Sequence, residues 1–300
     1  MNVSVVIPNY NGEEILGKNL PKVLEAAKDA EIIVVDDASV DGSLRVLNNF
    51  KTKIRVVKNE KNLGFSSTVN KGVREAKGEI VILLNTDVAP EKNFLAPLLS
   101  HFKDDSVFAV GCLDKSIEKN STVLRGRGVG YWKRGFLIHS RGEVDKASTL
   151  WVSGGSGAFR KSIWGKLNGF NELYNPFYWE DIDLSYRAVK SGCKIIFESE
   201  SVVIHEHEEG AVKERFPSSE IKAIAYRNQF IFVWKNATDL DLQLIHLLWL
   251  PYHFVKACLR RDLAFFKGFF SAFALLPKII KSSIEDQKMF VLKDSQIMFP

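Results

Sequence analysis

Residues 31–42 read EIIVVDDASVDG, and this apolar run stopped by two aspartates decides the fold. The branched residues at 32–35 predict a strand that is buried on both faces. Asp41 and Ser43 then predict the start of a helix that ends near Phe50. A buried strand followed by a polar turn and a helix is the repeating unit of a parallel α/β sheet.

The same unit repeats on both sides of this stretch. We predict strands at 3–7, 54–57 and 80–84, and helices at 13–28 and 66–76. Polar side chains follow the predicted strands: Asn9 and Asn11, Asp36 and Asp37, residues 59–62, and Asn85 and Asp87. In such sheets a ligand binds beyond the carboxyl ends of the strands. The sequence therefore predicts an α/β fold, a mostly parallel sheet with helices on both faces and a polar site at one edge.

The pattern after Asp87 is less regular. It indicates a helix at 92–102, a strand at 108–112, a loop at 125–142, a strand at 150–152 and two short strands at 195–197 and 202–204. A further helix is predicted to begin near Glu180. From about Pro217 the composition becomes aromatic and apolar, which predicts a separate helical region at 216–300 after a first domain at 1–215.

Composition narrows the class of protein. Of 300 residues, 46% are hydrophobic and 26% charged, which suits a sizeable globular domain. The formal net charge of +5, with both signs interspersed, argues against a nucleic-acid partner. The three cysteines are far apart, which argues against a disulfide framework or a zinc cluster and favours a reducing compartment. The first residues lack the pattern of a secretory signal, so we expect a cytoplasmic protein.

The helical region contains two apolar runs, at 244–255 and 263–276. Neither reaches the ~20 uninterrupted apolar residues that span a bilayer. Basic residues flank or interrupt them: Lys256, Arg260, Arg261, Lys267, Lys278 and Lys281. This pattern predicts helices that lie on the inner face of the cell membrane. Helices packed on the first domain or on another subunit are the alternative.

The acidic residues at the strand ends suggest a chemistry. A carboxylate at Asp36 or Asp37 can accept the imide N–H of a pyrimidine base, and Asp87 offers the oxygen ligand that Mg²⁺ or Mn²⁺ prefers. Helix capping is the structural alternative for each of them. An acid at a helix start, such as Asp181, can act as a general base.

The chain resembles a family 2 glycosyltransferase of the GT-A fold, and within that family a rhamnosyltransferase-like branch. Five segments carry the resemblance in order: VVIPNYN at 5–11, VVDDASVDG at 34–42, NLGFS at 62–66 with NKG at 70–72, LLNTD at 83–87 and WEDIDL at 179–184. Asn85 stands where the family usually has the first carboxylate of an Asp-x-Asp motif, and Asp87 keeps the second.

The resemblance implies a role for each candidate residue. It places the nucleotide on Pro8, Tyr10, Asn11, Asp36, Asp37, Gly64, Phe65 and Asn85, with the contact to the base left open between the two aspartates. It places the donor sugar or acceptor on Gly154, Gly155, Trp179 and Glu180. Asp181 is the expected general base, preferred to Glu180, and Asp87 with His205 would bind Mn²⁺ or Mg²⁺, with His207 as the second choice. Four arginines are candidates for an anionic acceptor or the diphosphate, with a solvated loop as the alternative: Arg125, Arg127, Arg134 and Arg141.

The function expected is an inverting, metal-dependent transfer of a sugar from a UDP or dTDP donor to an acceptor hydroxyl. Residues 1–113 would form the nucleotide-binding half and 114–215 the acceptor half. The acceptor would be a saccharide or a lipid-linked saccharide in the assembly of a cell-surface polysaccharide or glycolipid. Two alternatives are a sugar-1-phosphate nucleotidyltransferase, which would need a Gly-rich basic turn after the first strand, and an inactive membrane-bound scaffold or carbohydrate-binding relative.

Overall fold

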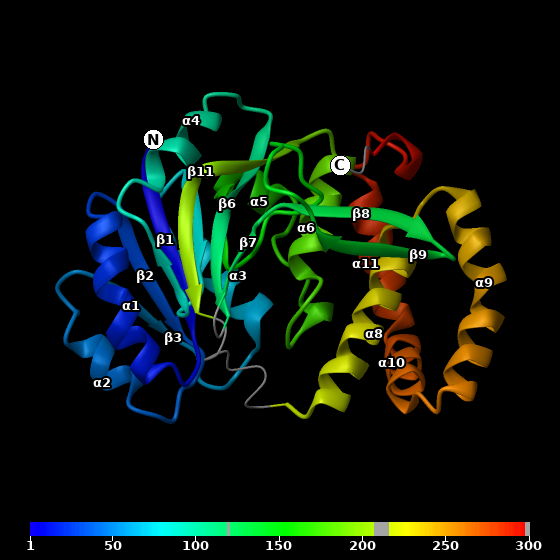
Figure 1. Cartoon of the computed structure of the whole chain (residues 1–300). Helices are drawn as coiled ribbons and strands as arrows, with labels where there is room; N and C mark the ends of the chain where they lie inside the picture. The colour runs from blue at the N-terminus through cyan, green and yellow to red at the C-terminus, as the bar shows by residue number, and fades with distance from the viewer. Residues whose placement is uncertain (119–120, 207–215, 298–300) are drawn as a thin grey trace.

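The computed structural model describes residues 1–118, 121–206 and 216–297 (Figure 1). The first eighty-four residues alternate strands and helices as predicted. In chain order the elements are β1 (Val3–Asn9), α1 (Glu13–Ala26), β2 (Glu31–Asp36), α2 (Ser43–Asn48), β3 (Arg55–Lys58), α3 (Phe65–Glu75) and β4 (Ile80–Leu84). The prediction of a β-α-β-α-β-α-β unit is confirmed.

The second half adds strands of both directions to the same sheet. Its elements are β5 (Val88–Pro90), α4 (Leu95–His101), β6 (Val107–Glu118), β7 (Ser121–Arg125), β8 (Gly128–Lys133), β9 (Phe136–Arg141), β10 (Ser156–Arg160), α5 (Lys161–Lys166), the 3₁₀ helix η1 (Glu172–Tyr174), α6 (Glu180–Lys190) and β11 (Lys194–Glu206). The sheet order is β3-β2-β1-β4-β10-β6-β11-β5, with β7 paired to β6.

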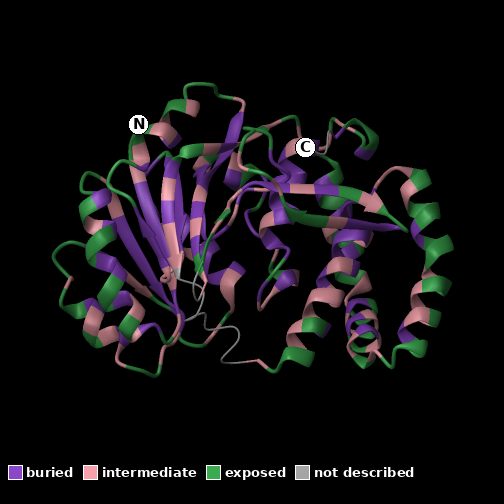
Figure 2. Ribbon diagram, in the orientation of Figure 1, coloured by how far each residue is buried: buried purple, intermediate pink, exposed green. Residues whose placement is uncertain are grey.

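The sheet is mixed: β1, β2, β3 and β4 are parallel to one another, as expected, and β6 pairs with β11 in parallel. β10 runs antiparallel between β4 and β6, and β5 and β7 are also antiparallel to their neighbours. One apolar core joins one sheet face to α1, α2 and α4, and a second joins the other face to α3, α5 and α6. Figure 2 shows the central strands buried between these helices. Helices therefore cover both faces and leave the strand ends free to form a site.

Three predictions in this half differ from the structure. The segment 125–142 is not a loop, because β8 and β9 form a hairpin joined by Arg134 and Gly135, which both have positive φ. Such a two-residue turn matches the twist of the flanking strands. The segment 150–152 is not a strand, since Leu150 N–H donates to the carbonyl of Gly128 and Val152 N–H to the hydroxyl of Ser185. The two short strands predicted near the end of the domain are one strand, β11, with an irregularity between Glu198 and Val202.

The C-terminal part is helical, as predicted. It contains α8 (Ser218–Asn236), α9 (Leu240–Leu259), α10 (Leu263–Ala274), α11 (Leu276–Gln287) and the 3₁₀ helix η3 (Asp294–Gln296). A third apolar core joins α8, α10 and α11 to α6 and to the β8–β9 hairpin. Packing on the first domain is thus observed for these helices, whereas α9 buries only His246 and Ala257. Within the described ranges no single helix has the length and apolar composition of a membrane span, although α10 and α11 meet both criteria as a pair bent by 64°.

Candidate functional site

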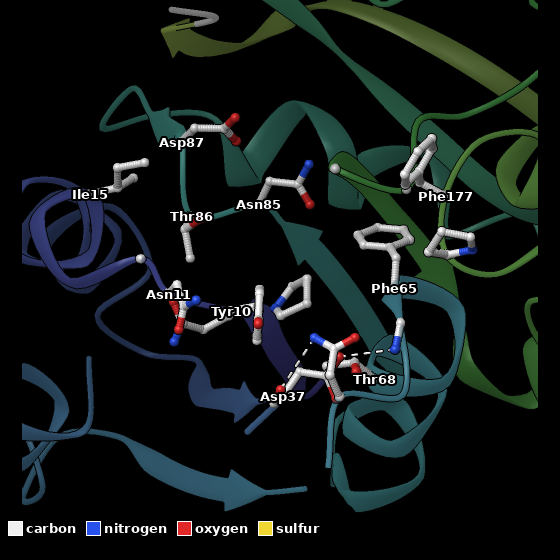
Figure 3. A pocket seen from close by; sticks show the side chains of 18 of the residues that line it. Tyr10, Asn11, Ile15, Asp37, Phe65, Thr68, Asn85, Thr86, Asp87 and Phe177 are labelled. Atoms are coloured by element: carbon white, nitrogen blue, oxygen red, sulfur yellow. Dashed lines mark hydrogen bonds between the residues drawn. The ribbon is translucent and has the colours of Figure 1, made fainter. Parts of the chain in front are cut away.

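A cavity of about 660 Å³ lies where the carboxyl ends of β1, β2 and β4 meet the start of α6 (Figure 3). Its volume is in the range of small-molecule and cofactor sites. Twelve of the residues predicted from sequence line it: Pro8, Tyr10, Asn11, Asp37, Gly64, Phe65, Asn85, Asp87, Gly154, Gly155, Glu180 and Asp181. Asp36, Trp179 and the four arginines do not line it, and His205 reaches it only through Asp87.

Asp37 forms one wall of the cavity and organises the loop after β3. Its carboxylate accepts hydrogen bonds from Leu63 N–H at 2.9 Å, Gly64 N–H at 3.0 Å and the Asn59 amide at 2.7 Å. Gly64 has a φ of +86°, a conformation that glycine adopts readily, and α3 starts directly after it. A carboxylate offers about four acceptor positions, so Asp37 retains capacity for a ligand donor.

Asp36 has a structural position. Its side chain is buried and accepts hydrogen bonds from the Asn9 amide at 2.8 Å and from Ser39 N–H at 3.1 Å. Ser39 in turn accepts a bond from Asn11 N–H, which lines the cavity. The structure separates the two aspartates: Asp37 faces the cavity, and Asp36 holds the turns beside it.

Asp87 lies across the cavity from Asp37 in the view of Figure 3. The pairing of β5 with β11 sets His205 opposite Val88 and so brings the imidazole to Asp87, with Nε2 3.2 Å from Asp87 Oδ2. The other ring nitrogen, Nδ1, lies 2.9 Å from Oδ2 of Asp114 on β6. Burial disfavours the charged imidazole, but hydrogen bonds to Asp114 and Asp87 outweigh it and raise the pKa of His205 to about 9.

Asp114 was missed by the sequence reasoning. Its only signal was a carboxylate just after the predicted apolar strand at 108–112, and the residue is 7% exposed. A histidine that binds a metal commonly gives its second ring N–H to a carboxylate, which fixes the ring and the tautomer. Asp114 is placed for that role toward His205.

The residues around Asp87 fit a divalent metal that takes some of its ligands from the protein and the others from a bound substrate. Asp87 Oδ1 is buried without a hydrogen-bond partner, as is Asn85 Oδ1. No group of three or more His, Cys, Asp or Glu side chains that could hold a metal occurs among the described residues. Mg²⁺ sites often use one or two protein ligands and take the others from phosphate oxygens and water. Asp87 and His205 would supply the protein ligands here, and His207 lies outside the described residues.

Asn85 is locked against the glycines that precede β10. Its N–H donates to the carbonyl of Gly155 at 2.9 Å. A β-carbon on Gly155 would lie 2.5 Å from the Asn85 amide nitrogen, so a larger residue there would force the Asn85 side chain to move. This close approach, and not a phosphate cradle, accounts for the glycine at 155, and it places the Asn85 amide at the cavity floor.

Asp181 and Glu180 lie at the start of α6. Asp181 is partly exposed at the cavity, and its Oδ1 accepts a hydrogen bond from Ile182 N–H at 2.8 Å. Burial raises the pKa of Asp181 to about 6, with backbone hydrogen bonds from Ile182 and Gly154 opposing the shift. Burial and the neighbouring charge of Asp181 raise the pKa of Glu180 well above its usual range. Its Oε2 is buried without a hydrogen-bond partner. The pKa of Asp181 is thus raised toward neutral pH, as suits a general base.

The backbone before these acids is strained. Tyr178 and Trp179 have φ angles of +70° and +76°, which non-glycine residues rarely adopt and which recur at functional sites. Trp179 does not line the cavity: it packs on His139 and Phe232, with centroid distances of 4.8 and 5.1 Å. The predicted contact of Trp179 with the donor sugar or acceptor stays a prediction, and in the structure this residue anchors α6 to α8 and the hairpin.

Asn228 of α8, which the sequence reasoning missed, holds this strained segment. It is fully buried, and its amide donates to the carbonyls of Tyr174 at 3.0 Å, Phe177 at 2.9 Å and Tyr178 at 2.9 Å. Nothing local in the sequence signals this contact, because α8 lies some fifty residues beyond the segment that it holds.

We expect Asn228→Ala to lower the free energy of unfolding by about 1–3 kcal/mol, because buried carbonyls lose their donor. The catalytic rate should fall, because the segment that positions Asp181 at the start of α6 loses its support. Nucleotide affinity should stay unchanged, because Asn228 does not contact Asp37. Urea unfolding and nucleotide titration measure the two effects. Asn48→Ala, on the exposed face of α2, is the matched control. Equal losses of nucleotide affinity and rate would contradict this assignment.

Several solved structures of sugar-nucleotide enzymes share the fold. A structure of GalNAc-T7 with UDP, GalNAc and Mn²⁺ aligns with a TM-score of 0.64 and 20% identity over 78% of this chain and 48% of that one. The mannosyltransferase PcManGT of Pyrobaculum calidifontis, in complex with GDP-Man and Mn²⁺, aligns with a TM-score of 0.58 and 17% identity over 96% of this chain and 84% of that one. The fold is therefore that of GT-A glycosyltransferases.

The sequence matches the family model of glycosyl transferase family 2 at residues 4–166, and the chain belongs to this family. The O-antigen chain rhamnosyltransferase of Salmonella typhimurium is 25% identical over 69% of this chain and 67% of its own length. The corresponding enzyme of Salmonella anatum is 29% identical over 68% and 66%. The cholesterol galactosyltransferase of Borreliella burgdorferi is 36% identical, but the match covers 35% of this chain and less than a third, 30%, of that relative. The predicted resemblance, including its rhamnosyltransferase-like branch, is confirmed.

Proposed function

We propose that this glycosyltransferase moves a sugar from a nucleoside diphosphate donor to an acceptor hydroxyl with inversion at the anomeric carbon. The observation that carries the proposal is the placement of Asp37, Asp87 and Asp181 around one cavity. Asp37 suits the nucleoside, Asp87 the diphosphate and Asp181 the acceptor. The UDP and GDP-Man complexes of the structural neighbours support a nucleotide-sugar donor.

Each residue has a distinct part in the transfer. Asp181, ionised at neutral pH, would take the proton of the acceptor hydroxyl as its oxygen attacks the anomeric carbon from the face opposite the diphosphate. Because the acceptor oxygen would attack from the face opposite the diphosphate while the bond to the diphosphate breaks, the product would have inverted configuration. Glu180, kept neutral by burial, can donate a hydrogen bond to a sugar hydroxyl. A bound Mn²⁺ or Mg²⁺ would neutralise charge on the leaving diphosphate.

The donor and acceptor are proposed from the relatives. Two relatives are O-antigen chain rhamnosyltransferases, which supports a UDP- or dTDP-linked hexose or deoxyhexose such as rhamnose as the donor sugar. The same names support a saccharide acceptor, free or lipid-linked, in the assembly of a cell-surface polysaccharide or glycolipid. The nucleotide-binding half at 1–113 would act on the donor and the half at 114–215 on the acceptor.

We place the enzyme in the cytoplasm, peripheral on the inner face of the membrane. The support is α9, a twenty-residue helix of which only two residues are buried. Its exposed face carries large apolar side chains, among them Leu247, Leu248 and Leu259, with exposures of 60%, 77% and 82%. A patch of this kind on a soluble surface usually marks a partner or a membrane.

The metal and nucleotide assignment is tested by thermal unfolding with a panel of nucleoside diphosphates in Mn²⁺, Mg²⁺ or EDTA. We expect UDP or dTDP to raise the unfolding midpoint of the wild type when metal is present, and Asp87→Ala to abolish that rise. Asp29→Ala, at an exposed turn, should behave as the wild type. If no nucleotide stabilises the wild type, the transferase proposal gives way to the inactive scaffold.

A further inference from the structure

A second cavity, of about 390 Å³, lies between the β8–β9 hairpin and helices α8, α9 and α10. It shares no lining residue with the donor cavity. Its wall is basic and aromatic, and the side chains that matter most are Lys133, Arg134, Tyr226, His253, Lys256 and Arg260. The reaction proposed above uses none of them.

The positive charge of this cavity is not balanced. Among the described residues, none of its four cations, Lys133, Arg134, Lys256 and Arg260, forms an ion pair with a carboxylate. The acid in its wall, Asp262, is already engaged by Lys222 at 2.7 Å and the Tyr226 hydroxyl at 2.9 Å. Burial lowers the pKa of His253, and the nearby charges of Lys256 and Arg134 lower it further. The cavity therefore favours an anion.

The cations at the hairpin are held in place. Arg134 donates to the Tyr252 hydroxyl at 2.6 Å, and its guanidinium lies over the Trp249 and Tyr252 rings, 5.3 and 4.8 Å from their centroids. The carbonyl oxygen of Arg134 accepts a hydrogen bond from Nε2 of His253 at 2.9 Å. A guanidinium fixed by stacking keeps N–H groups for the planar, bidentate binding of phosphate oxygens.

The surroundings of the cavity are apolar. Val255, Leu259 and Leu263, at the end of α9 and the start of α10, are 58%, 82% and 78% exposed. A ligand that matches both the basic cavity and the exposed apolar side chains beside it has a negatively charged head group and apolar chains. Basic side chains beside exposed leucines on a helix that lies parallel to a surface are the pattern of binding to anionic lipid.

We propose that this second cavity binds the phosphate group of an anionic membrane lipid while the exposed face of α9 enters the head-group boundary of the bilayer. The proposal deepens the peripheral location given above and does not depend on the transfer reaction. Helix α8 also connects the two cavities. Phe216, just before α8, lines the donor cavity, and Tyr226 on α8 lines the second cavity. Ser218 and Tyr226 lie ~12 Å apart along the helix.

Flotation of the full chain with vesicles tests the proposal without donor or turnover. We expect binding to phosphatidylcholine vesicles that contain phosphatidylglycerol and much weaker binding to phosphatidylcholine alone. Arg134→Glu with Lys256→Glu should reduce the bound fraction about tenfold or more. Lys51→Glu with Lys53→Glu, which changes the net charge equally at an exposed turn of the first domain, should reduce it by less than about twofold.

Two further arms separate lipid from other occupants. Leu248→Asn with Leu259→Asn, both at exposed positions, should also weaken binding to the anionic vesicles, and an unchanged unfolding midpoint would show that the variants fold. Glycerol 3-phosphate that stabilises the protein through Arg134 without any vesicle binding would overturn the lipid assignment in favour of a small-anion site. A stable dimer that covers α9 and excludes vesicles would also overturn the lipid assignment. The same holds if Arg134→Glu with Lys256→Glu leaves binding to the anionic vesicles unchanged.

Discussion

Asp181→Asn is expected to lower kcat for sugar transfer by about 10³-fold while the affinity for the nucleotide stays close to that of the wild type. Asparagine preserves the volume at the start of α6 and still accepts the bond from Ile182 N–H, but it cannot take a proton. Initial rates at saturating donor, together with nucleotide titration, measure the two quantities. A rate within tenfold of the wild type would remove Asp181 from the role of general base.

The same residue predicts a pH profile. Because burial raises the pKa of Asp181 to about 6, the active, ionised form should be lost below that pH, and kcat should fall on the acid side with a midpoint near it. Glu180 is adjacent and buried, so the two acids titrate as a pair. Asp145→Asn, at an exposed position, keeps the wild-type profile if the effect belongs to the site. A flat profile between pH 5 and 8 would contradict the assignment.

Asp183→Ala is expected to lower the free energy of unfolding by about 3–5 kcal/mol, the cost of removing one partner from a buried ion pair. The fully buried carboxylate accepts bonds from Lys235 at 2.8 Å and from Arg187 at 2.7 Å. It also accepts from the Tyr174 hydroxyl and the Asn236 amide. The substitution leaves two cations without this partner in the core that joins α6 to α8, so urea unfolding should show the loss directly.

A control variant and the pH dependence of stability test whether the effect of Asp183→Ala comes from its buried ion pairs. Asp105→Ala removes a carboxylate that is fully exposed and lies 3.5 Å from Arg160, and should leave the free energy of unfolding nearly unchanged. Burial opposes ionisation of Asp183, but Arg187 and Lys235 outweigh it and hold its pKa well below the usual range. Its stabilisation should therefore persist at neutral pH and be lost as the pH falls below ~3.9. A loss under 1 kcal/mol for Asp183→Ala would mean that α8 docks by apolar packing alone.

The chain order of strands and helices up to β4 could be predicted because each decision there is local. A run of branched apolar residues buries both faces of a strand, and the polar residues after it end the strand at the site edge. That rule brought Asp37, Asn85 and Asp87 to one cavity from sequence alone. Asp181 followed from the acidic start of a helix and from the family resemblance.

The tertiary structure decided what depends on contacts between distant residues. Asp114 meets His205 across 91 positions, and Asn228 holds the segment before α6 from a helix some fifty residues later. Asp36 and Asp37 are equal in the sequence, and only the packing of the neighbouring turns sends one into the interior and the other to the cavity. The β8–β9 hairpin was missed for the same reason, because Phe136 and Leu137 find their apolar partners on α8 and in the residues around it. The periodicity of apolar residues indicates which side chains are buried. The packing of elements that are far apart in the chain decides which surfaces contact one another.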